Sequence, residues 1–344
     1  MASVLKIAVI GTGSLGKEHA RIYSELSASA SIELTGVYDA SAEAAQKIAT
    51  KHGVKAFASL DEAIHACDAA SLVTPTVTHF DLAKKLLNQK KHVLVEKPMT
   101  DTSEQAAELI SLAQSQNCLL QVGHIERFNP IFHYLVDVAT EPKFIETHRL
   151  SPYPNRSTDI GVVLDLMIHD LDVVLAFVKS PVIHVDAVGI PVLSKSEDIA
   201  NARLRFKNGC VANLTVSRVS PEKMRKIRVF SGGKMTSYVS LDYRAQEGFI
   251  YRIAKDGEQE SSLLKKLLSS KDSTIVSEFA GKRIVREPVP IEKAEPLRVE
   301  LQSFIDCVRA RQTPVVSGES AKMALDLAFE ITRQILANNP GPVE

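Results

Sequence analysis

The stretch that decides the fold is Leu5-Lys-Ile-Ala-Val-Ile-Gly11-Thr-Gly13-Ser-Leu-Gly16, near the start of the 344-residue chain. Residues 5–10 form a mostly apolar run, which is typical of a buried parallel strand. A helical stretch over Ser14 to Leu26 overlaps the glycine motif. Gly11 permits a tight turn, Gly13 lets the backbone approach a pyrophosphate, and Gly16 allows close packing of helix on strand. The motif therefore predicts a dinucleotide site at the amino end of this helix.

An acidic residue follows the next strand. That strand is expected over Ile32 to Tyr38, and Asp39 comes directly after it. The Asp39 carboxylate can accept hydrogen bonds from both ribose hydroxyls and would repel a 2′-phosphate. The sequence thus favours NAD over NADP, although a basic residue elsewhere could restore NADP binding. The predicted cofactor-binding residues are Gly11, Thr12, Gly13, Ser14, Leu15, Gly16, Asp39, Thr74, Pro75, His79, Glu96 and Lys97.

Strands and helices alternate as far as residue 123. Six such units predict a doubly wound α/β Rossmann domain over residues 1–123. Further strands are expected at Val54–Phe57, Ala69–Val73, His92–Val95 and Cys118–Val122, and further helices at Ser41–His52, from Ser59, at Val77–Gln89 and at Thr100–Gln116.

One of these strands ends abruptly in Glu96-Lys97-Pro98. Ligands bind at the carboxyl ends of strands in such sheets, and a lysine there can reach a ligand. Taken alone, the triplet is better explained as a surface strand end with two solvated charges. The surrounding pattern favours the functional interpretation.

Residues 124–344 are expected to form an α+β substrate-binding and oligomerisation domain. Consecutive strands without crossover helices predict a large, mainly antiparallel open sheet. A type I′ turn is expected at Asn208-Gly209. One face of such a sheet often packs on another subunit, which predicts a homodimer or homotetramer. Strands are expected at Phe144–Leu150, Val182–Val188, Ile199–Phe206, Cys210–Ser217, Lys226–Phe230 and Met235–Leu241, with one or two more within residues 255–293 and helices near 130–139, 295–310 and 319–337.

Asp165 and His169 lie in an otherwise apolar segment with helical spacing. Positions i and i+4 share a helix face. Burying both groups unpaired would cost several kcal/mol, so a shared role or a cleft explains them better than a plain core helix. A metal-dependent phosphohydrolase using His169-Asp170 would need further histidine ligands nearby, and the other histidines are scattered, so no metal site is expected.

Arginines flank the same region. Arg127 and Asn129 mark the crossing between domains, where a hinge with a helix cap and a ligand-binding cleft are equally good explanations. Arg149 and Arg156 flank a Ser-Pro-Tyr-Pro loop, where they could grip a diphosphate or form surface ion pairs. The predicted substrate-binding residues are Lys97, Arg127, Asn129, Arg149, Asn155, Arg156, Asp165 and His169.

Composition excludes several classes of function. The formal net charge of +0 gives no electrostatic case for nucleic acid or an anionic membrane surface. The four cysteines are far apart and form no CxxC pair, so they are expected to be reduced and mostly buried. Neither a signal peptide nor a membrane-spanning run is visible, so a cytoplasmic location is expected.

With its Gly11–Gly16 motif, Glu96-Lys97-Pro98 and the Asp165-x3-His169 pair, the chain resembles the Gfo/Idh/MocA oxidoreductases over nearly its whole length. The resemblance implies a cis Lys97–Pro98 peptide, and implies that Lys97, Asp165 and His169 meet at the nicotinamide. Narrower likenesses, including Gly123–Pro130, His148-Arg149-Leu150 and Asp198–Arg203, point to the members that act on nucleotide sugars. They imply oxidation of a sugar hydroxyl, at C3 of UDP-N-acetylglucosamine, on the route to a 2,3-diamino sugar of lipid A.

The residue types suggest their roles. An imidazole titrates near ~6.5, so His169 is expected to act as the general base in oxidation. Glu96, if near enough, favours the ammonium form of Lys97, which would then stabilise the developing alkoxide. Asp165 would orient His169 or bind a substrate hydroxyl, and an exchange of roles between Lys97 and His169 is the main alternative. Another sugar or inositol as substrate, and a non-catalytic NAD(H)-binding redox sensor, are the alternative functions.

Overall fold

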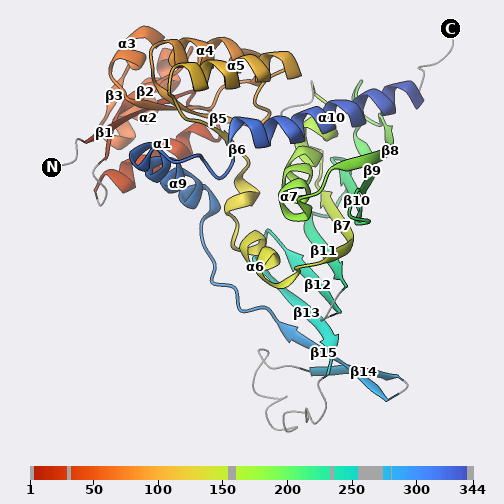
Figure 1. Cartoon of the computed structure of the whole chain (residues 1–344). Helices are drawn as coiled ribbons and strands as arrows, with labels where there is room; N and C mark the ends of the chain where they lie inside the picture. The colour runs from red at the N-terminus through yellow and green to blue at the C-terminus, as the bar shows by residue number, and fades with distance from the viewer. Residues whose placement is uncertain are drawn as a thin grey trace. The chain divides into compact units, whose positions relative to one another are not determined.

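The computed structural model describes residues 4–28, 32–153, 160–232, 236–254, 274–279 and 281–338. The chain forms two compact units (Figure 1). The first comprises Met1–Phe128 and Glu295–Asp326, and the second Asn129–Ala294 and Leu327–Glu344. The division along the chain thus lies between residues 128 and 129, five positions after the expected boundary.

The first unit is built on a parallel sheet with the strand order β3-β2-β1-β4-β5-β6, which confirms the doubly wound Rossmann architecture. Helices α4 and α5 lie side by side on one face of the sheet, and α1 lies on the other (Figure 1). The strands are β1 (Leu5–Ile10), β2 (Ile32–Tyr38), β3 (Lys55–Ala56), β4 (Ala69–Leu72), β5 (His92–Glu96) and β6 (Leu120–Gly123). The helices are α1 (Gly16–Ser27), α2 (Ala42–His52), α3 (Leu60–His65), η1 (Thr76–Thr78), α4 (His79–Asn88), α5 (Ser103–Ser115) and η2 (Ile125–Phe128).

Side-chain caps explain where several of these helices begin. Ser41, Ser59 and Thr102 each stand just before a helix and accept a hydrogen bond from a backbone N–H of its first turn. At α3 the Glu62 carboxylate also accepts a bond from the N–H of Ala58, one residue before the cap. The arrangement resembles a capping box displaced by one residue.

Helix α9 (Pro296–Ala310) belongs to the first unit, whereas the sequence placed it in the second domain. Its apolar stripe, which includes Leu301 and Phe304, joins the same buried core as β1 and α1. Burial of that stripe accounts for the position of the helix, because each fully buried large side chain contributes roughly 1.5–3 kcal/mol. Such a pairing across nearly 300 residues leaves no local signal in the sequence.

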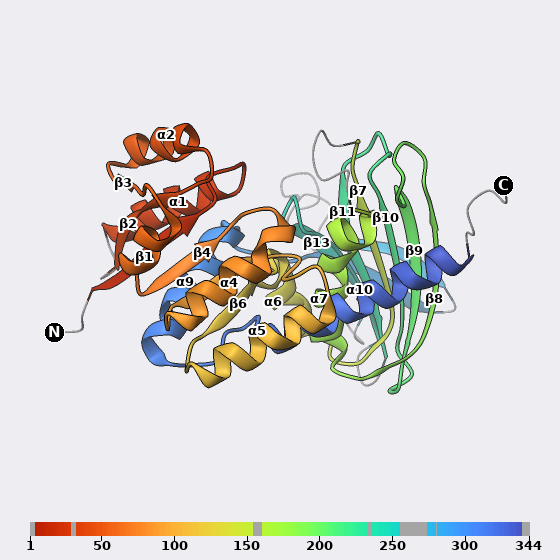
Figure 2. The same ribbon diagram turned by 90° about the horizontal axis from the view of Figure 1, so that it is seen from above.

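The second unit carries a sheet with the order β14-β15-β13-β12-β11-β7-β10-β9-β8. Strands β7 and β10 are parallel and the other pairs are antiparallel, as expected for a mainly antiparallel sheet. Helix α7 and the later part of α10 lie along one face of this sheet (Figure 2). The strands are β7 (Pro142–Leu150), β8 (Val182–Ile190), β9 (Ile199–Phe206), β10 (Val211–Ser217), β11 (Met224–Ser231), β12 (Ser237–Asp242), β13 (Glu247–Ile253), β14 (Thr274–Phe279) and β15 (Lys282–Pro288), and the helices are α6 (Pro130–Val138), η3 (Val163–Met167), α7 (Ile168–Val178) and α10 (Gly318–Asn338).

The β9–β10 hairpin is confirmed, but its turn is not the expected type I′. Only Gly209 has a positive φ, +85°, whereas a type I′ turn requires it at Asn208 as well. The Phe206 N–H donates to the Cys210 carbonyl oxygen and the Gly209 N–H donates to the Phe206 carbonyl oxygen, each at 2.9 Å. The loop is therefore a type I turn followed by a left-handed glycine.

All four cysteines are buried free thiols. Burial raises the pKa of Cys67 and of Cys210 to about 11, so neither forms a thiolate at neutral pH. Among the residues that the structure describes, no helix has the length and apolar character needed to cross a membrane.

Candidate active site

The glycine turn after β1 has the shape that a dinucleotide needs. Gly11 adopts φ +94°, and a Cβ there would meet the Val73 carbonyl oxygen at 2.2 Å. A Cβ on Gly16 would meet the Gly11 oxygen at 2.0 Å, so both positions require glycine. Gly13 faces open space, which leaves room for a pyrophosphate at the amino end of α1. These residues fit the predicted cofactor.

Asp39 is held beside that turn. Its Oδ2 accepts hydrogen bonds from the Thr12 N–H at 2.7 Å and the Thr12 hydroxyl at 2.8 Å, and Oδ1 accepts one from the Ser41 N–H at 2.9 Å. Burial acts to raise the pKa of Asp39, but these hydrogen bonds outweigh it and hold the pKa below its usual value. A fixed, ionised carboxylate therefore stands at the end of β2, where the ribose of a dinucleotide would lie.

Lys97 lies at the carboxyl end of β5, and its peptide bond to Pro98 is cis, as the resemblance implied. Glu96 is 8% exposed and its Oε1 lies 3.2 Å from Nε2 of His19 on α1. A Cβ on Gly123 would meet the Glu96 carboxylate at 2.7 Å, so this glycine makes room for it. Successive side chains on a strand point to opposite faces. Glu96 is thus directed towards α1, and its expected effect on the charge of Lys97 stays a prediction.

A histidine near Lys97, His124, was not among the residues predicted from the sequence. His124 follows β6 directly and is only 1% exposed. Burial, and next the positive charges of Lys97 and Arg127, lower the pKa of His124 to about 3. His124 is therefore neutral at physiological pH. The sequence does indicate this position, because His124 directly follows Gly123 at the end of β6, the strand that pairs with β5.

His79 joins the two strand ends that form this edge. Its Nε2 lies 2.8 Å from the Thr74 carbonyl oxygen and its Nδ1 lies 2.9 Å from that of Pro98. The ring is 1% exposed. His79 was predicted to bind the cofactor, and the structure places it between the Thr74-Pro75 segment after β4 and the cis peptide after β5.

In the second unit, Asp165 and His169 lie where η3 passes into α7. The expected regular helix is instead a π turn over Val163–Met167, followed by α-helix from Ile168. Both side chains are partly exposed, whereas their apolar neighbours Met167 and Ile168 are buried. Single π turns inside helices occur frequently at functional sites.

Arg149 forms a buried ion pair next to this segment. Its Nε and Nη2 donate to the two carboxylate oxygens of Asp170 at 3.1 and 3.0 Å, and both side chains are at most 5% exposed. The pair fastens α7 to β7. The structure thus places Arg149 in an ion pair, and its contact with a diphosphate stays a prediction.

The other predicted substrate residues have varied positions. Asn129 caps α6, accepting from the Ile131 N–H at 3.1 Å, and donates to the Tyr243 carbonyl at 3.0 Å. Arg127 is partly exposed, and its Nη2 lies 3.4 Å from the Val315 carbonyl oxygen. Asn155 and Arg156 lie outside the described residues.

Lys97 belongs to the first unit, and Asp165 and His169 to the second. That these three meet at a nicotinamide stays a prediction. Within the described ranges, no group of three histidine, cysteine or acidic side chains is arranged to hold a metal ion.

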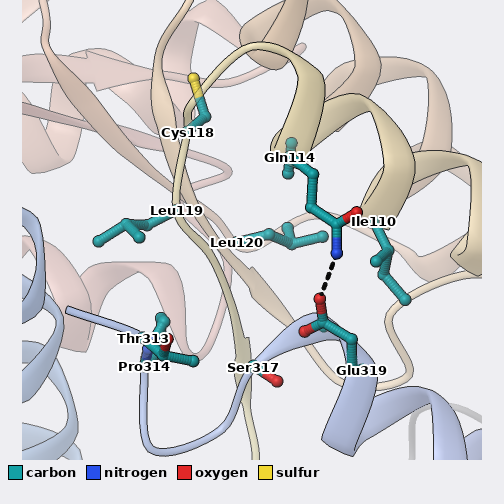
Figure 3. A pocket seen from close by; sticks show the side chains of 11 residues that line it. Ile110, Gln114, Cys118, Leu119, Leu120, Thr313, Pro314, Ser317 and Glu319 are labelled. Atoms are coloured by element: carbon teal, nitrogen blue, oxygen red, sulfur yellow. Dashed lines mark hydrogen bonds between the residues drawn. The ribbon is translucent and has the colours of Figure 1, made fainter. Parts of the chain in front are cut away.

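A cavity of about 250 Å³ lies in the first unit, between α5, the start of β6 and the segment that leads into α10 (Figure 3). Gln114 donates to the Glu319 carboxylate across it at 2.8 Å. None of the predicted site residues lines it. It adjoins the amino end of β6, whereas Lys97 and the glycine turn lie at the carboxyl ends of their strands.

Comparison with known proteins defines the class. Residues 5–124 match the oxidoreductase family with the NAD-binding Rossmann fold, and residues 138–234 match the C-terminal domain of the GFO/IDH/MocA proteins. The chain belongs to the Gfo/Idh/MocA oxidoreductases.

Individual relatives cover almost the whole chain. UDP-N-acetylglucosamine 3-dehydrogenase of Acidithiobacillus ferrooxidans is 34% identical over 328 residues, which is 95% of this chain and 96% of the relative. A solved structure of that enzyme, GnnA, superposes with a TM-score of 0.83 at 32% identity, covering 98% of this chain and 99% of the other. The NAD(+)-dependent scyllo-inositol 2-dehydrogenase of Bacillus subtilis is 24% identical over 99% of this chain and 96% of its own length.

Proposed function

We propose that the protein oxidises a sugar hydroxyl to a ketone with NAD, at C3 of UDP-N-acetylglucosamine. This would be the first step towards a 2,3-diamino sugar for lipid A. The observation that carries the substrate is the likeness to UDP-N-acetylglucosamine 3-dehydrogenase, at 34% identity over 95% of the chain. The site supports the reaction class, since the glycine turn and Lys97 lie at the same carboxyl edge of one parallel sheet.

NAD is the proposed cofactor because Asp39 is fixed and ionised at the end of β2. Its carboxylate would accept from the ribose hydroxyls and repel the extra phosphate of NADP. We expect Asp39→Ala to weaken NAD binding roughly tenfold or more, since bonds to a charged group contribute about 1.5–3 kcal/mol. The same change should reduce the ratio of the NAD affinity to the NADP affinity. Titration calorimetry with both nucleotides measures this, and equal binding of the two by the unaltered protein would contradict the proposal.

We assign the transfer of the hydroxyl proton to His169. The bound nicotinamide supplies the hydride acceptor. The His169 imidazole takes the hydroxyl proton in oxidation and returns it in reduction, because its ordinary pKa lies near ~6.5. Asp165 orients His169 or binds a substrate hydroxyl, and the Lys97 ammonium stabilises the alkoxide as it forms. The alternative exchanges the roles of Lys97 and His169.

The direct test is NADH formation with a panel containing UDP-N-acetylglucosamine, UDP-glucose, free N-acetylglucosamine and inositols. We expect turnover with the first, and a product lighter by two hydrogens in mass spectrometry. His169→Ala and Lys97→Ala should each lose most turnover and still bind NAD. Near-normal turnover in either variant would remove that residue from the mechanism.

The same panel tests the alternatives. Turnover with an inositol would favour the chemistry of the relatives named as inositol dehydrogenases. A flat panel with tight NAD binding would favour a redox sensor. A sensor would have no need of Lys97, Asp165 and His169 together, which is why an enzyme is preferred.

The proposed working state is a homodimer or homotetramer formed through the second unit's sheet, in the cytoplasm. The face opposite α7 displays a row of rings across four neighbouring strands, namely Phe144, Phe230, Tyr238 and Tyr251, and we call it the aromatic row. A second row runs Asp186, Arg203, Asn213, Glu146 and Arg228 across five strands. Charges that alternate in this way can pair with a second copy of the same face.

A further inference from the structure

A buried carboxylate, Asp198, organises the residues around the start of the Asp165–His169 segment. Its Oδ2 accepts hydrogen bonds from the backbone N–H groups of residues 192, 193 and 194 at 2.6–2.9 Å. Its Oδ1 accepts from the Ser194 hydroxyl at 2.8 Å and from Nε of Arg218 at 2.7 Å. Although burial acts to raise the pKa of Asp198, these bonds lower it well below its usual value. The group is therefore an ion at any physiological pH.

Arg218 carries the connection to the functional segment. Its side chain is fully buried, and its three nitrogens bond to Asp198, to the Ser194 hydroxyl and to the Ile160 carbonyl, the last at 2.7 Å. Its guanidinium also lies 5.7 Å from the centre of the Tyr153 ring. One buried cation thus fixes residue 160, three positions before the π turn begins.

Glu197 makes the next contacts along the chain. Its backbone carbonyl accepts from the Val162 N–H at 3.0 Å, and its Oε1 accepts from the Val163 N–H at 3.2 Å. A Cβ on Gly161 would meet that Oε1 at 1.9 Å, so glycine permits the approach. The N–H groups at the start of the turn are therefore bound to the backbone and to the side chain of Glu197.

We propose that Asp198, Arg218 and Glu197, named here the anchor cluster, are positioning residues that set the orientation of Asp165 and His169. This inference rests on the proposed function of that pair. Residues 160, 162 and 163 are held from the amino-terminal side, and the Arg149–Asp170 ion pair holds α7 just after His169. A π turn is an irregular backbone that needs support from outside the helix. The two anchors lie on either side of the catalytic pair.

Glu197 offers the sharpest test, because its variants leave the buried Asp198–Arg218 ion pair intact. Glu197→Ala removes the acceptor of the Val163 N–H, whereas Glu197→Gln keeps an acceptor oxygen and removes only the charge. The matched control is Gln246→Ala, which breaks two side-chain bonds to the backbone of Ala294 elsewhere in the same unit. Kinetics with UDP-N-acetylglucosamine and NAD are measured below the melting temperature of every variant.

We expect Glu197→Ala to lower kcat about tenfold or more, since small misplacements of catalytic groups are costly. The KM for NAD should stay within about twofold, because the cofactor residues lie in the other unit. Glu197→Gln should recover most of kcat, and Gln246→Ala should leave it unchanged. A kcat for Glu197→Ala equal to that of the unaltered protein, or losses in Gln246→Ala of the same size, would overturn the proposal.

A second measurement separates this inference from the proposed function. The protein has ten histidines, and His169→Ala identifies the imidazole signal of His169 in a histidine-labelled NMR spectrum. We expect that signal to shift in Glu197→Ala and to return in Glu197→Gln. If no sugar is oxidised yet the signal shifts, the proposed function fails and the anchor stands. If sugar is oxidised and the signal is the same in all variants, the anchor fails alone.

Discussion

At the scale of single residues, His79 is a residue predicted to bind the cofactor whose ring is buried between two backbone carbonyl groups. Its two ring nitrogens face two carbonyl oxygens, and a neutral imidazole can donate to only one of them. The ring connects Thr74 with Pro98, and so links the segment after β4 to the backbone that carries Lys97. Its sequence position near Thr74-Pro75 indicated the right neighbourhood, but the bond to Pro98 depends on the cis turn and is invisible in the sequence.

We expect His79→Ala to reduce kcat about tenfold. The Pro98 carbonyl would lose its contact with the His79 ring, and the position of the adjacent Lys97 would become less fixed. The unfolding free energy should fall by roughly 2–4 kcal/mol, since the change leaves a cavity and removes the donor of one buried carbonyl oxygen. Steady-state kinetics and urea unfolding measure the two effects. His133→Ala, at an exposed histidine, is the control. A large rise in the Kd for NAD with unchanged kcat would instead support the earlier prediction of direct cofactor binding.

At the scale of elements, the regular pieces were predictable and their junctions were not. Strands β1, β2 and β9 begin and end where the apolar pattern placed them. Local hydrophobic periods and caps carry that information. The Asn208-Gly209 turn differs because two- and three-residue loops share the same residues. The contacts of Arg149 with Asp170 and of Glu96 with His19 were also not predicted, since contacts between distant elements leave no spacing to read.

The hairpin turn supplies a test at this scale. Gly209→Ala should lower the unfolding free energy by about 1 kcal/mol, because alanine resists a left-handed backbone. No atom lies within 4 Å of the added Cβ, so the cost is conformational rather than steric. Lys207→Ala, in the same loop without a positive φ, should change it by less than half as much. Equal losses of unfolding free energy in both variants would argue against a left-handed backbone at Gly209.

At the scale of the whole molecule, the open sheet face should decide the oligomeric state. Tyr238→Glu places a charge in the centre of the aromatic row, between Phe230 and Tyr251. We expect association to weaken at least about tenfold, since buried aromatic side chains dominate interface energies. Light scattering over a concentration series measures this. Val77→Glu, at a side chain that is 69% exposed in the first unit, is the control. An unchanged mass for Tyr238→Glu would place the interface elsewhere.

Stability should also depend on pH through two buried histidines. Burial, with a smaller contribution from Arg311, lowers the pKa of His92 to about 4, and His124 titrates at about 3. Both folded-state values lie below the unfolded value of ~6.5, so the unfolded chain binds more protons between these limits. The stability that the two neutral histidines contribute to the folded state is therefore fully present above pH ~6.5. It is lost progressively as the pH falls towards 4 and then 3.

Urea unfolding at pH 7 and pH 5 measures this loss. His92→Gln should reduce the difference between the two pH values by on the order of 1 kcal/mol, after allowance for solvent screening. Gln keeps an acceptor for the Leu119 N–H, which now bonds to Nδ1 of His92 at 2.9 Å. His133→Gln, at an exposed position, should leave the difference as it is. An equal pH dependence in all three proteins would assign the acid sensitivity to other groups.

The buried thiols have a consequence for how the chain opens. Cys67, Cys118 and Cys307 lie in the first unit and Cys210 in the second, and each is shielded in the native state. An alkylating reagent can reach a thiol only when the structure around it opens. Pulses of reagent in rising urea, read by peptide mass, would therefore time the exposure of each unit separately. Modification of Cys210 before or after the other three would show which half of the enzyme loosens first.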